Sequence, residues 1–533
     1  MPEYLTDLND NEVISCDVAI VGAGAAGLTL ARTLSGSALT VCVFESGGMD
    51  FDQQSQALAA GENTGDRYYD LIDSRLRFFG GTTAIWGGRC ARYDAHDFER
   101  REWVQDSGWP ISLADVEPYY TRATKDFELG DGAAAASAWQ DGIGERLGFD
   151  QRVMTTGRWR FDDVAERFSS TRQQDLFATN GLRMVLHANL VDIEVNDNAN
   201  TVTGLQFANK EGQRTRVTAR SYVLACGGID NARVLLASNS VQPNGIGNDS
   251  DCVGRYFMEH PHGRVGIMEA GKGFELWSAF QRRSDAEGRR VAPVLLPSAG
   301  VQRERELLNS ALTFKLQRDP VHGLAAQKKL MNQLKHQLAP TQRARSMWHG
   351  YRALRKFVQR TVRKPLARAK FNAGKTRVNV MVRAEQAPNR ESRVFLASET
   401  DRFGIPLANL HWRLSSQDKH TVRELGRLLD AELRRLGLGS LALSDWLHES
   451  SDSWPVDETV GNHPIAGYHH IGTTRMSESA TSGVVDRDCR VHGYDNLYIA
   501  GSSVFPTASW ANPTFTIVAL AHRLADKLLE DLK

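Results

Sequence analysis

The chain has 533 residues and a mass of 59.1 kDa, with 64 lysines and arginines against 64 aspartates and glutamates. This charge balance argues against a dedicated nucleic-acid binder, and a mean hydropathy of -0.39 without a long apolar run excludes an integral membrane protein. Six cysteines stand singly and far apart, which predicts buried thiols and neither disulfides nor a metal site.

The first 14 residues are acidic and show neither a basic segment followed by an apolar one nor a twin-arginine motif. We therefore expect no signal peptide, and the cytoplasm is the expected location.

The first strong pattern predicts a dinucleotide-binding βαβ unit. A strand-like run over residues 16–21 precedes the glycine turn 22–27 and a helix-forming stretch. A second strand, residues 40–44, ends at Glu45, which stands 23 positions after the first glycine of the turn. Both a flavin and a nicotinamide dinucleotide fit this unit.

The residue types within the unit suit contact with a dinucleotide. Gly22 permits the tight turn, and Gly24 lets the backbone approach a pyrophosphate at the positive end of the helix. Gly27 allows the helix to pack closely on the strand, and Glu45 can accept a hydrogen bond from a ribose hydroxyl. A late strand and turn, residues 498–503, can bring backbone N–H groups to the same ligand, which favours a permanently bound flavin.

Further along the chain, a group of predicted strands returns to the first sheet, and a different set of elements follows it. A second glycine-rich segment, 80–88, and an alanine-rich connector, 131–142, come first. The predicted strands and helix that return the chain to the first sheet are residues 183–186, 190–195, 202–207, 221–225 and 229–238. The elements predicted beyond residue 260 are strands 289–295, 377–382 and 392–396, a capped amphipathic helix from Ser415 to Gly437, strand 497–500 and helix 513–529.

One segment contains an excess of basic residues, which the rest of the chain balances with an excess of acidic ones. From Pro320 to Ala384 there are 16 basic residues and no acidic ones, which leaves 48 − 64 = −16 for the remainder. Pro340 and Pro365 bracket a predicted basic amphipathic helix with an apolar stripe at Met347, Tyr351, Leu354, Val358 and Val362, and residues 324–338 repeat the pattern. The segment fits a helical hairpin with a solvated basic face, a dock for an anionic membrane, or a contact with an acidic partner or second subunit.

Five motifs spread over nearly the whole chain resemble those of the glucose-methanol-choline (GMC) oxidoreductases. They are GAGAAG at 22–27, GGTTAIWGG at 80–88, VGRYFMEHP at 253–261, HHIGTTRM at 469–476 and NLYIAGSSVFPTASWANPTFT at 496–516. Trp86 in the second motif, together with SGWP at 107–110, is similar to the sugar-oxidising branch that contains pyranose oxidases and glucoside 3-dehydrogenases.

The resemblance implies an α/β fold with two parts. One is a Rossmann-type FAD-binding domain like that of glutathione reductase, and the other is a substrate domain built on an antiparallel sheet with helices. The expected boundaries are 1–110, 181–260 and 461–533 for the FAD-binding domain, 111–180 for a connector with part of the substrate domain, and 261–460 for the substrate domain with a basic helical insertion at 320–384.

The resemblance also implies FAD as the cofactor. The residues expected to contact it are Gly22, Gly24, Gly27, Glu45, Gly81, Thr82, Trp86, Gly87, Val191, Gly501, Ser502, Pro513 and Thr514. Val191 would cover the adenine. In pyranose oxidases a histidine in the second motif bonds covalently to the flavin, and Ile85 occupies that position here, so we expect non-covalent FAD.

The family's catalytic base maps onto His469, because Gly472 and Thr473 follow at the spacing of the HxxGT motif, and its second catalytic position maps onto Asn512. Oxidation of an alcohol removes the hydroxyl proton while a hydride leaves the same carbon for flavin N5, and neutral histidine suits the proton. A polar partner such as Asn512 orients the oxygen and stabilises developing negative charge.

Each catalytic assignment has a competitor. His470 is the neighbour of His469 and an alternative base. Asn512 precedes a proline at the start of a predicted helix, so it also reads as a simple N-cap. We interpret His260, in the VGRYFMEHP motif, as a structural hydrogen-bonding residue.

We therefore expect a cytoplasmic FAD-dependent dehydrogenase, with an oxidase as the variant, that oxidises a hydroxyl of a sugar, glycoside or polyol to a carbonyl. The alternatives are a flavin-dependent lyase or decarboxylase on the same fold, and oxidation of an aryl or lipid-linked alcohol. Its expected partners are the alcohol, an electron acceptor (quinone, another carrier or oxygen), and an anionic inner membrane face or acidic subunit at 320–384, with no nucleic acid.

Overall fold

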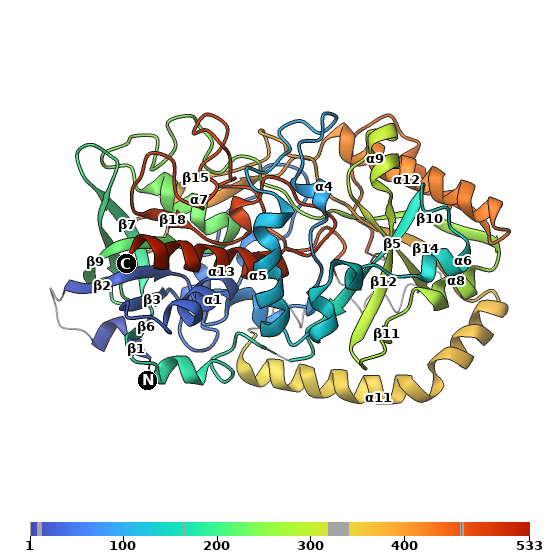
Figure 1. The fold of residues 1–533 in the computed structure, drawn as a ribbon, viewed down its shortest axis with the longest axis horizontal. Helices are drawn as coiled ribbons and strands as arrows, with labels where there is room; N and C mark the ends of the chain where they lie inside the picture. The colour runs from blue at the N-terminus through green and yellow to red at the C-terminus, as the bar shows by residue number, and fades with distance from the viewer. Residues whose placement is uncertain (1, 8–12, 165, 318–339, 459, 461–462) are drawn as a thin grey trace.

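Two eight-stranded sheets lie at opposite ends of an elongated molecule, and the chain passes between them several times (Figure 1). The computed structural model describes residues 2–7, 13–164, 166–317, 340–458, 460 and 463–533. A small two-stranded sheet, β15 (Arg393–Thr400) and β16 (Pro406–His411), stands apart from both. This architecture confirms the predicted α/β fold class.

The first sheet contains the dinucleotide-binding unit. Its strand order is β1 (Glu3–Tyr4), β6 (Leu182–Leu186), β3 (Val41–Glu45), β2 (Val13–Val21), β9 (Arg214–Leu224), β8 (Val202–Ala208) and β7 (Asn189–Val195), with β18 (Leu497–Ile499) also paired to β9. The strands from β1 to β9 and β18 pair in parallel, whereas β8 pairs antiparallel with both β9 and β7. The predicted return of residues 183–225 to this sheet is confirmed.

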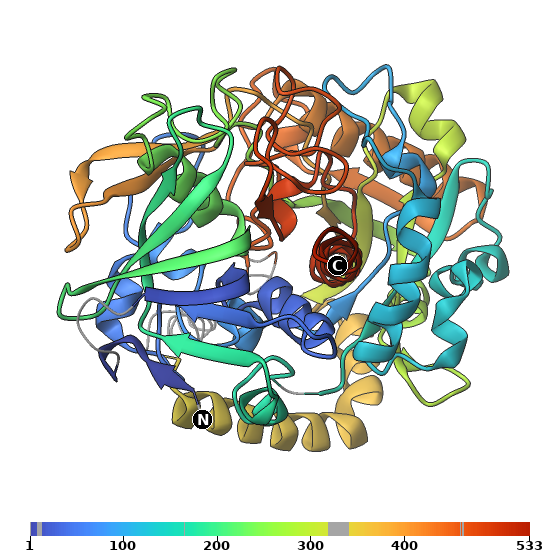
Figure 2. The same cartoon turned by 60° about the vertical axis from the view of Figure 1, so that its left-hand side comes forward.

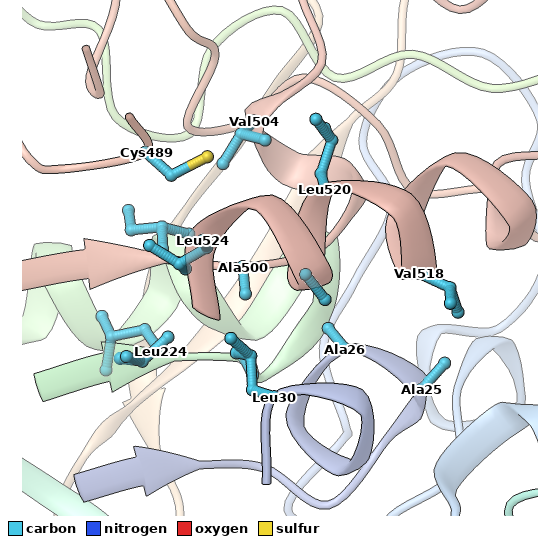
Figure 3. Close-up of a cluster of buried hydrophobic side chains, with 14 of the residues drawn as sticks. Ala25, Ala26, Leu30, Leu224, Cys489, Ala500, Val504, Val518, Leu520 and Leu524 are labelled. Atoms are coloured by element: carbon cyan, nitrogen blue, oxygen red, sulfur yellow. The ribbon is translucent and has the colours of Figure 1, made fainter. Parts of the chain in front are cut away.

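Helices α1 (Ala25–Leu34) and α13 (Thr514–Asp531) pack together beside this sheet. Figure 3 shows Leu30 of α1 and Leu524 of α13 turned toward Leu224 at the end of β9, and all three side chains are buried. In Figure 2, which looks almost along α13, α5 (Leu113–Asp126) lies on the side of α13 away from the sheet. The N-terminal ends of α1 and α13 are thus fixed near the carboxyl ends of the parallel strands.

The turn between β2 and α1 requires glycine at two positions. Gly22 has φ +106°, in the left-handed region that side chains disfavour. A Cβ at Gly27 would lie 1.9 Å from the carbonyl oxygen of Gly22. The helix therefore starts directly over the end of the strand because both residues lack side chains.

The second sheet is antiparallel. Its strand order is β17 (Gly439–Leu443), β10 (His262–Gly271), β14 (Arg377–Arg383), β13 (Ala311–Gln317), β12 (Arg290–Pro297), β5 (Met154–Phe161) and β4 (Arg89–Cys90), with β11 (Arg283–Ser284) paired to β12. Helix α12 (Ser416–Arg435) covers one end, and the predicted capping box of Ser415 and Asp418 is present. The remaining α-helices are α2 (Gln53–Ala57), α3 (Leu71–Ser74), α4 (Ala95–Phe98), α6 (Ile143–Leu147), α7 (Gly227–Ala237), α8 (Gly273–Ala279) and α9 (Ala299–Arg305).

The basic segment contains one long helix, α11 (Gln342–Asn372), which runs along the lower edge of the molecule in Figure 1. Its first turn is bound to the first half of the chain, since the Asp50 carboxylate accepts from the Gln342 backbone N–H at 2.9 Å and pairs with Arg345 at 3.0 Å. Near its other end Arg368 pairs with Glu275 of α8 at 3.1 Å. The helix therefore bridges the two halves of the molecule.

Two predictions about this segment were wrong. The helix does not end at Pro365 but continues to Asn372, because the contacts of its last turns offset the backbone hydrogen bond that proline removes. Met347 does not pack in an apolar stripe, since 77% of its surface is exposed. The predicted repeat at 324–338 and the side chains of 351–364 lie outside the described residues.

Candidate active site

A cavity of about 830 Å³ lies between the two sheets. Its walls combine the carboxyl ends of β2 and β3, the amino ends of α1 and α13, and the strands β10, β13 and β14 of the antiparallel sheet. In open α/β sheets, ligands bind outside the carboxyl ends of the parallel strands. The cavity is therefore placed where a dinucleotide would meet a substrate.

Most of the predicted cofactor residues line this cavity. They are Gly22, Gly24, Glu45, Gly81, Thr82, Trp86, Gly87, Gly501, Ser502, Pro513 and Thr514. Gly27 does not line the cavity and packs behind its wall. Val191 is buried in β7 and does not line the cavity either, whereas its neighbour Leu190 does. Ile85 also lines the cavity, at the end of a 3₁₀ turn over Gly81–Ile85.

The walls leave room for a dinucleotide such as FAD. A Cβ built at Gly24, Gly227 or Gly501 would meet no atom within 4 Å, so three backbone segments face open space. The Glu45 carboxylate accepts from the Ala23 N–H through Oε2 and from the Gly47 N–H through Oε1, each at 2.9 Å. Glu45 thus holds the glycine turn in shape as well as facing the cavity.

His469 and Asn512 meet in this cavity although they are 43 positions apart. The Nδ2 of Asn512 lies 3.1 Å from Nε2 of His469, and both residues are half-buried in the lining. The N-cap position of α13 belongs to Pro513, and no side chain caps the helix. The N-cap interpretation of Asn512 is therefore wrong, because its side chain turns to the histidine instead.

His260 contacts the other side of the His469 ring. Its Nδ1 lies 2.7 Å from Nδ1 of His469, and its Nε2 lies 2.8 Å from the carbonyl oxygen of Ser509. A carbonyl oxygen accepts only, so Nε2 of His260 carries the hydrogen and Nδ1 of the neutral ring is an acceptor. His469 must then donate from Nδ1, which leaves the lone pair on its Nε2 facing Asn512 and the cavity.

The surroundings favour neutral imidazoles at this site. Burial lowers the pKa of His469 well below its usual range, and nearby positive charge, including that of Arg383, lowers it further. Burial also lowers the pKa of His260 to about 4. Near neutral pH both rings are therefore uncharged, and His469 is available to accept a proton.

Glu259 supports the segment that carries His469. The buried carboxylate accepts from the backbone N–H groups of His469 at 2.8 Å, His260 at 2.9 Å and Gly467 at 3.2 Å, and from the Tyr68 hydroxyl at 2.6 Å. Burial raises the pKa of Glu259 to about 7, while these four donors stabilise its ionised form. One side chain thus ties together both contacting histidines.

His470, the alternative base, has a different environment. Its ring is buried, and its Nε2 lies 3.1 Å from the Tyr68 hydroxyl, which donates to Glu259. Burial lowers the pKa of His470 to about 3. His470 also lines the cavity, but Asn512 contacts His469 and not His470.

Sequence reasoning missed Glu259, Tyr68 and Arg383. Glu259 stands inside the motif at 253–261, so a buried carboxylate in a conspicuous segment was an available signal. Nothing in the sequence marks Tyr68 or Arg383, which reach the site through tertiary packing.

Other expectations concern metals, thiols and membrane spans. Within the described ranges, no group of three or more potential ligands could hold a metal ion, and no helix is long and apolar enough to cross a membrane. All six cysteines are free thiols, five of them buried and Cys226 half-buried at the cavity.

Comparison with known proteins gives family matches over most of the chain and a shared fold. Two GMC oxidoreductase family models match residues 19–262 and 388–521. The fructose dehydrogenase large subunit of Gluconobacter japonicus is 24% identical over 98% of this chain and 99% of its own, and paromamine 6'-oxidase of Streptomyces fradiae is 24% identical over 97% and 92%. The crystal structure of formate oxidase shares the fold, with a TM-score of 0.55 and 16% identity over 99% of this chain and 100% of that one.

Proposed function

The chain belongs to the GMC oxidoreductases, FAD-dependent enzymes that oxidise alcohol-type substrates, and from that premise we propose that it oxidises a hydroxyl of a sugar, glycoside or polyol to a carbonyl. The observation that carries this proposal is the pairing of His469 with Asn512 in the cavity wall, with the basic lone pair of His469 on Nε2. Two relatives named for a sugar and an aminoglycoside core support the substrate class.

His469 and Asn512 have different roles toward the substrate hydroxyl. A substrate oxygen placed against both side chains would replace their mutual hydrogen bond, donate its hydrogen to Nε2 of His469 and accept from Nδ2 of Asn512. His469 then takes the proton, and the asparagine stabilises the charge that grows on the oxygen. FAD bound along the cavity supplies the acceptor for the hydride that leaves the alcohol carbon. The amino end of α13, directly after Asn512, presents its positive pole to the same region.

We assign positioning roles to His260 and Glu259. His260 selects the tautomer of His469 through the contact between their Nδ1 atoms. Glu259 fixes the backbone on either side of the His469 ring. A base held in one orientation and one tautomer needs no rearrangement when the substrate arrives.

The cofactor and location of the protein complete the proposal. Because Ile85 stands at the position of the tethering histidine, FAD is held non-covalently. The protein is a dehydrogenase of the cytoplasm that passes electrons to quinone, another carrier or oxygen. The basic helix α11 is its contact with the anionic inner membrane face or with an acidic subunit.

Anaerobic mixing with a panel of sugars, glycosides, polyols and aryl alcohols tests the reaction. We expect at least one sugar or polyol to bleach the flavin absorbance and to yield one carbonyl product per flavin. Conversion of a substrate without net bleaching would instead support a lyase or decarboxylase. Bleaching by aryl alcohols alone would retain the oxidation and overturn the substrate class.

A further inference from the structure

The antiparallel sheet forms the wall of the cavity opposite the glycine turn. Thr313 of β13 lies opposite Met381 of β14, while Lys315 and Arg383 stand toward opposite ends of the same two strands, and all four residues line the cavity. His262, the first residue of β10, is the cross-strand partner of Arg383. This wall therefore decides what kind of group can accompany the hydroxyl that faces His469.

The charges in this wall have one sign. Arg89, Arg282, Lys315 and Arg383 all line the cavity from the antiparallel sheet and its connections. The carboxylates in the described lining come from elsewhere in the fold and are Glu45, Asp73, Asp230 and Asp401. Asp230 pairs with Arg75, and Asp401 pairs with Arg233. The described part of the antiparallel sheet thus contributes four cations and no carboxylate to the lining.

Arg383 is the cation whose contacts are most informative. Its Nη1 donates to Nε2 of His262 at 3.0 Å, and its guanidinium lies over the Trp159 ring at 5.4 Å. No carboxylate in the described chain forms an ion pair with it, whereas the buried Arg101 forms a bidentate pair with Glu385. Burial lowers the pKa of Arg383 to about 10, which reflects a charge taken out of water without a compensating anion.

Apart from the N–H that Nη1 donates to His262, the donors of this guanidinium are not engaged by any carboxylate of the described chain. Five N–H groups in a plane match the oxygens of a carboxylate or a phosphoryl group, and an unpaired buried charge is costly until an anion arrives. Arg383 and His469 line the same cavity, and each contacts a histidine of the segment 260–262: Arg383 contacts His262, and His469 contacts His260. An anion at Arg383 and a hydroxyl at His469 can therefore belong to one small molecule.

We propose that the alcohol substrate carries an anionic oxygen group, either a carboxylate or a phosphoryl group, and that Arg383 binds this group while the reacting hydroxyl faces His469. This inference rests on the proposed function and names its substrate class. Lys315, Arg282 and Arg89 line other parts of the same cavity.

Matched sugars test the proposal on the wild-type holoenzyme. Anaerobic flavin reduction is measured with glucose, its neutral methyl glycoside, gluconate, glucuronate and glucose 6-phosphate. We expect the anionic members to reduce the flavin at concentrations about 10–100-fold lower than the neutral ones, the range given by charged hydrogen bonds. The acid and phosphate arms separate a carboxylate from a phosphoryl group.

Substitution of Arg383 provides the second arm. Arg383→Gln should weaken the response to anionic sugars about 10–100-fold more than the response to neutral ones, while Arg383→Lys should restore part of the difference. Arg377→Gln is the matched control, because Arg377 is exposed at the other end of the same strand and outside the lining. FAD content and thermal midpoint verify that each variant is folded.

Binding of inorganic phosphate, followed by the change in flavin absorbance of the holoenzyme, gives a readout that needs no turnover. We expect saturable binding in the wild type and in Arg377→Gln, and its loss in Arg383→Gln. Equal use of neutral and anionic sugars, with no phosphate binding that depends on Arg383, would overturn the inference and leave the oxidation standing. If no alcohol bleaches the flavin, the proposed function fails, while phosphate binding still decides whether Arg383 holds an anion.

Discussion

His469 is suited to its task by the groups on both sides of its ring. The carbonyl oxygen of Ser509 sets the hydrogen on His260, His260 sets the hydrogen on His469, and the remaining lone pair faces Asn512. The chain of hydrogen bonds ends at a backbone carbonyl, which cannot change its role as an acceptor. The tautomer of His469 is therefore determined by the fold.

Alanine substitutions of the two adjacent histidines should differ in their effect on flavin reduction. His469→Ala removes the base, so flavin reduction by substrate should fall about 10²–10⁴-fold with FAD retained. His470→Ala should lose much less, because its ring contacts Tyr68 and not Asn512. Stopped-flow traces of anaerobic reduction provide the comparison, and greater damage in His470→Ala would move the base by one residue.

Removal of the acceptor on His260 should disturb the tautomer of His469. We expect His260→Phe to lower the limiting rate of flavin reduction about 10-fold or more with little change in substrate affinity. His260→Asn keeps an acceptor near the place of Nδ1 and should recover part of the rate. An effect confined to affinity, or no recovery with asparagine, would contradict the positioning role.

The rate of flavin reduction should depend on pH in a definite direction. Because the folded pKa of His469 lies below its usual value of about 6.5, the neutral base persists to lower pH than in a free histidine. The acid limb of the rate profile should therefore fall below pH 6.5. A profile that declines already from pH 8 toward 7 would contradict a neutral, buried base.

At the scale of elements, the turn Gly81–Ile85 carries the residue on which the proposal of non-covalent FAD rests. Isoleucine at position 85 has no group that can bond to a flavin, so acid precipitation should release all of the yellow colour as FAD. The absorbance of the supernatant and of the redissolved pellet is the measurement. Flavin that stays with the denatured chain would show a covalent bond elsewhere.

Helix α11 is the element with the strongest charge. Its 31 residues include ten lysines and arginines and no acidic residue, and it lies at the edge of the molecule (Figure 1). Each basic residue near an anionic surface contributes about 1 kcal/mol. We expect salt-sensitive sedimentation with anionic liposomes and little with neutral ones.

Charge reversal tests whether α11 itself, and not the overall charge of the protein, binds the liposomes. The double substitution Lys356→Glu with Arg360→Glu should abolish sedimentation, whereas Arg427→Glu with Arg434→Glu on α12 should not. Trp348 of the same helix lines the cavity. A wild-type protein that stays in the supernatant with both liposomes would favour an acidic subunit as the partner of α11.

Most elements could be predicted because their signals are local. The strand, turn and helix around Gly22, like the capping box at Ser415, depend on residues that are close together in the sequence. The end of α11 could not be predicted from local sequence, since its turns after Pro365 contact α8 through Arg368 and Phe371, which are tertiary contacts. The motifs likewise indicated His469 and Asn512 but not Arg383, whose place depends on the register of three strands.

For the whole molecule, the cavity between the two sheets is the feature that joins all of these parts. The first sheet and α13 line the part of the cavity that we propose for the cofactor, while the antiparallel sheet contributes Arg383 and the wall that we propose for the substrate. His469 and His260 come from segments between them and meet where the two halves touch. The reaction therefore requires both sheets, which explains why no single segment of the sequence contains the site.

A single-turnover experiment with a substrate deuterated at the carbinol carbon tests the central claim most directly. Flavin bleaching and product are followed together under anaerobic conditions, with the undeuterated substrate as the reference. We predict slower bleaching with the deuterated substrate, one carbonyl product per flavin, and loss of that deuterium from the product carbon. A flavin that stays oxidised while a product retaining the deuterium accumulates would contradict alcohol oxidation by this site.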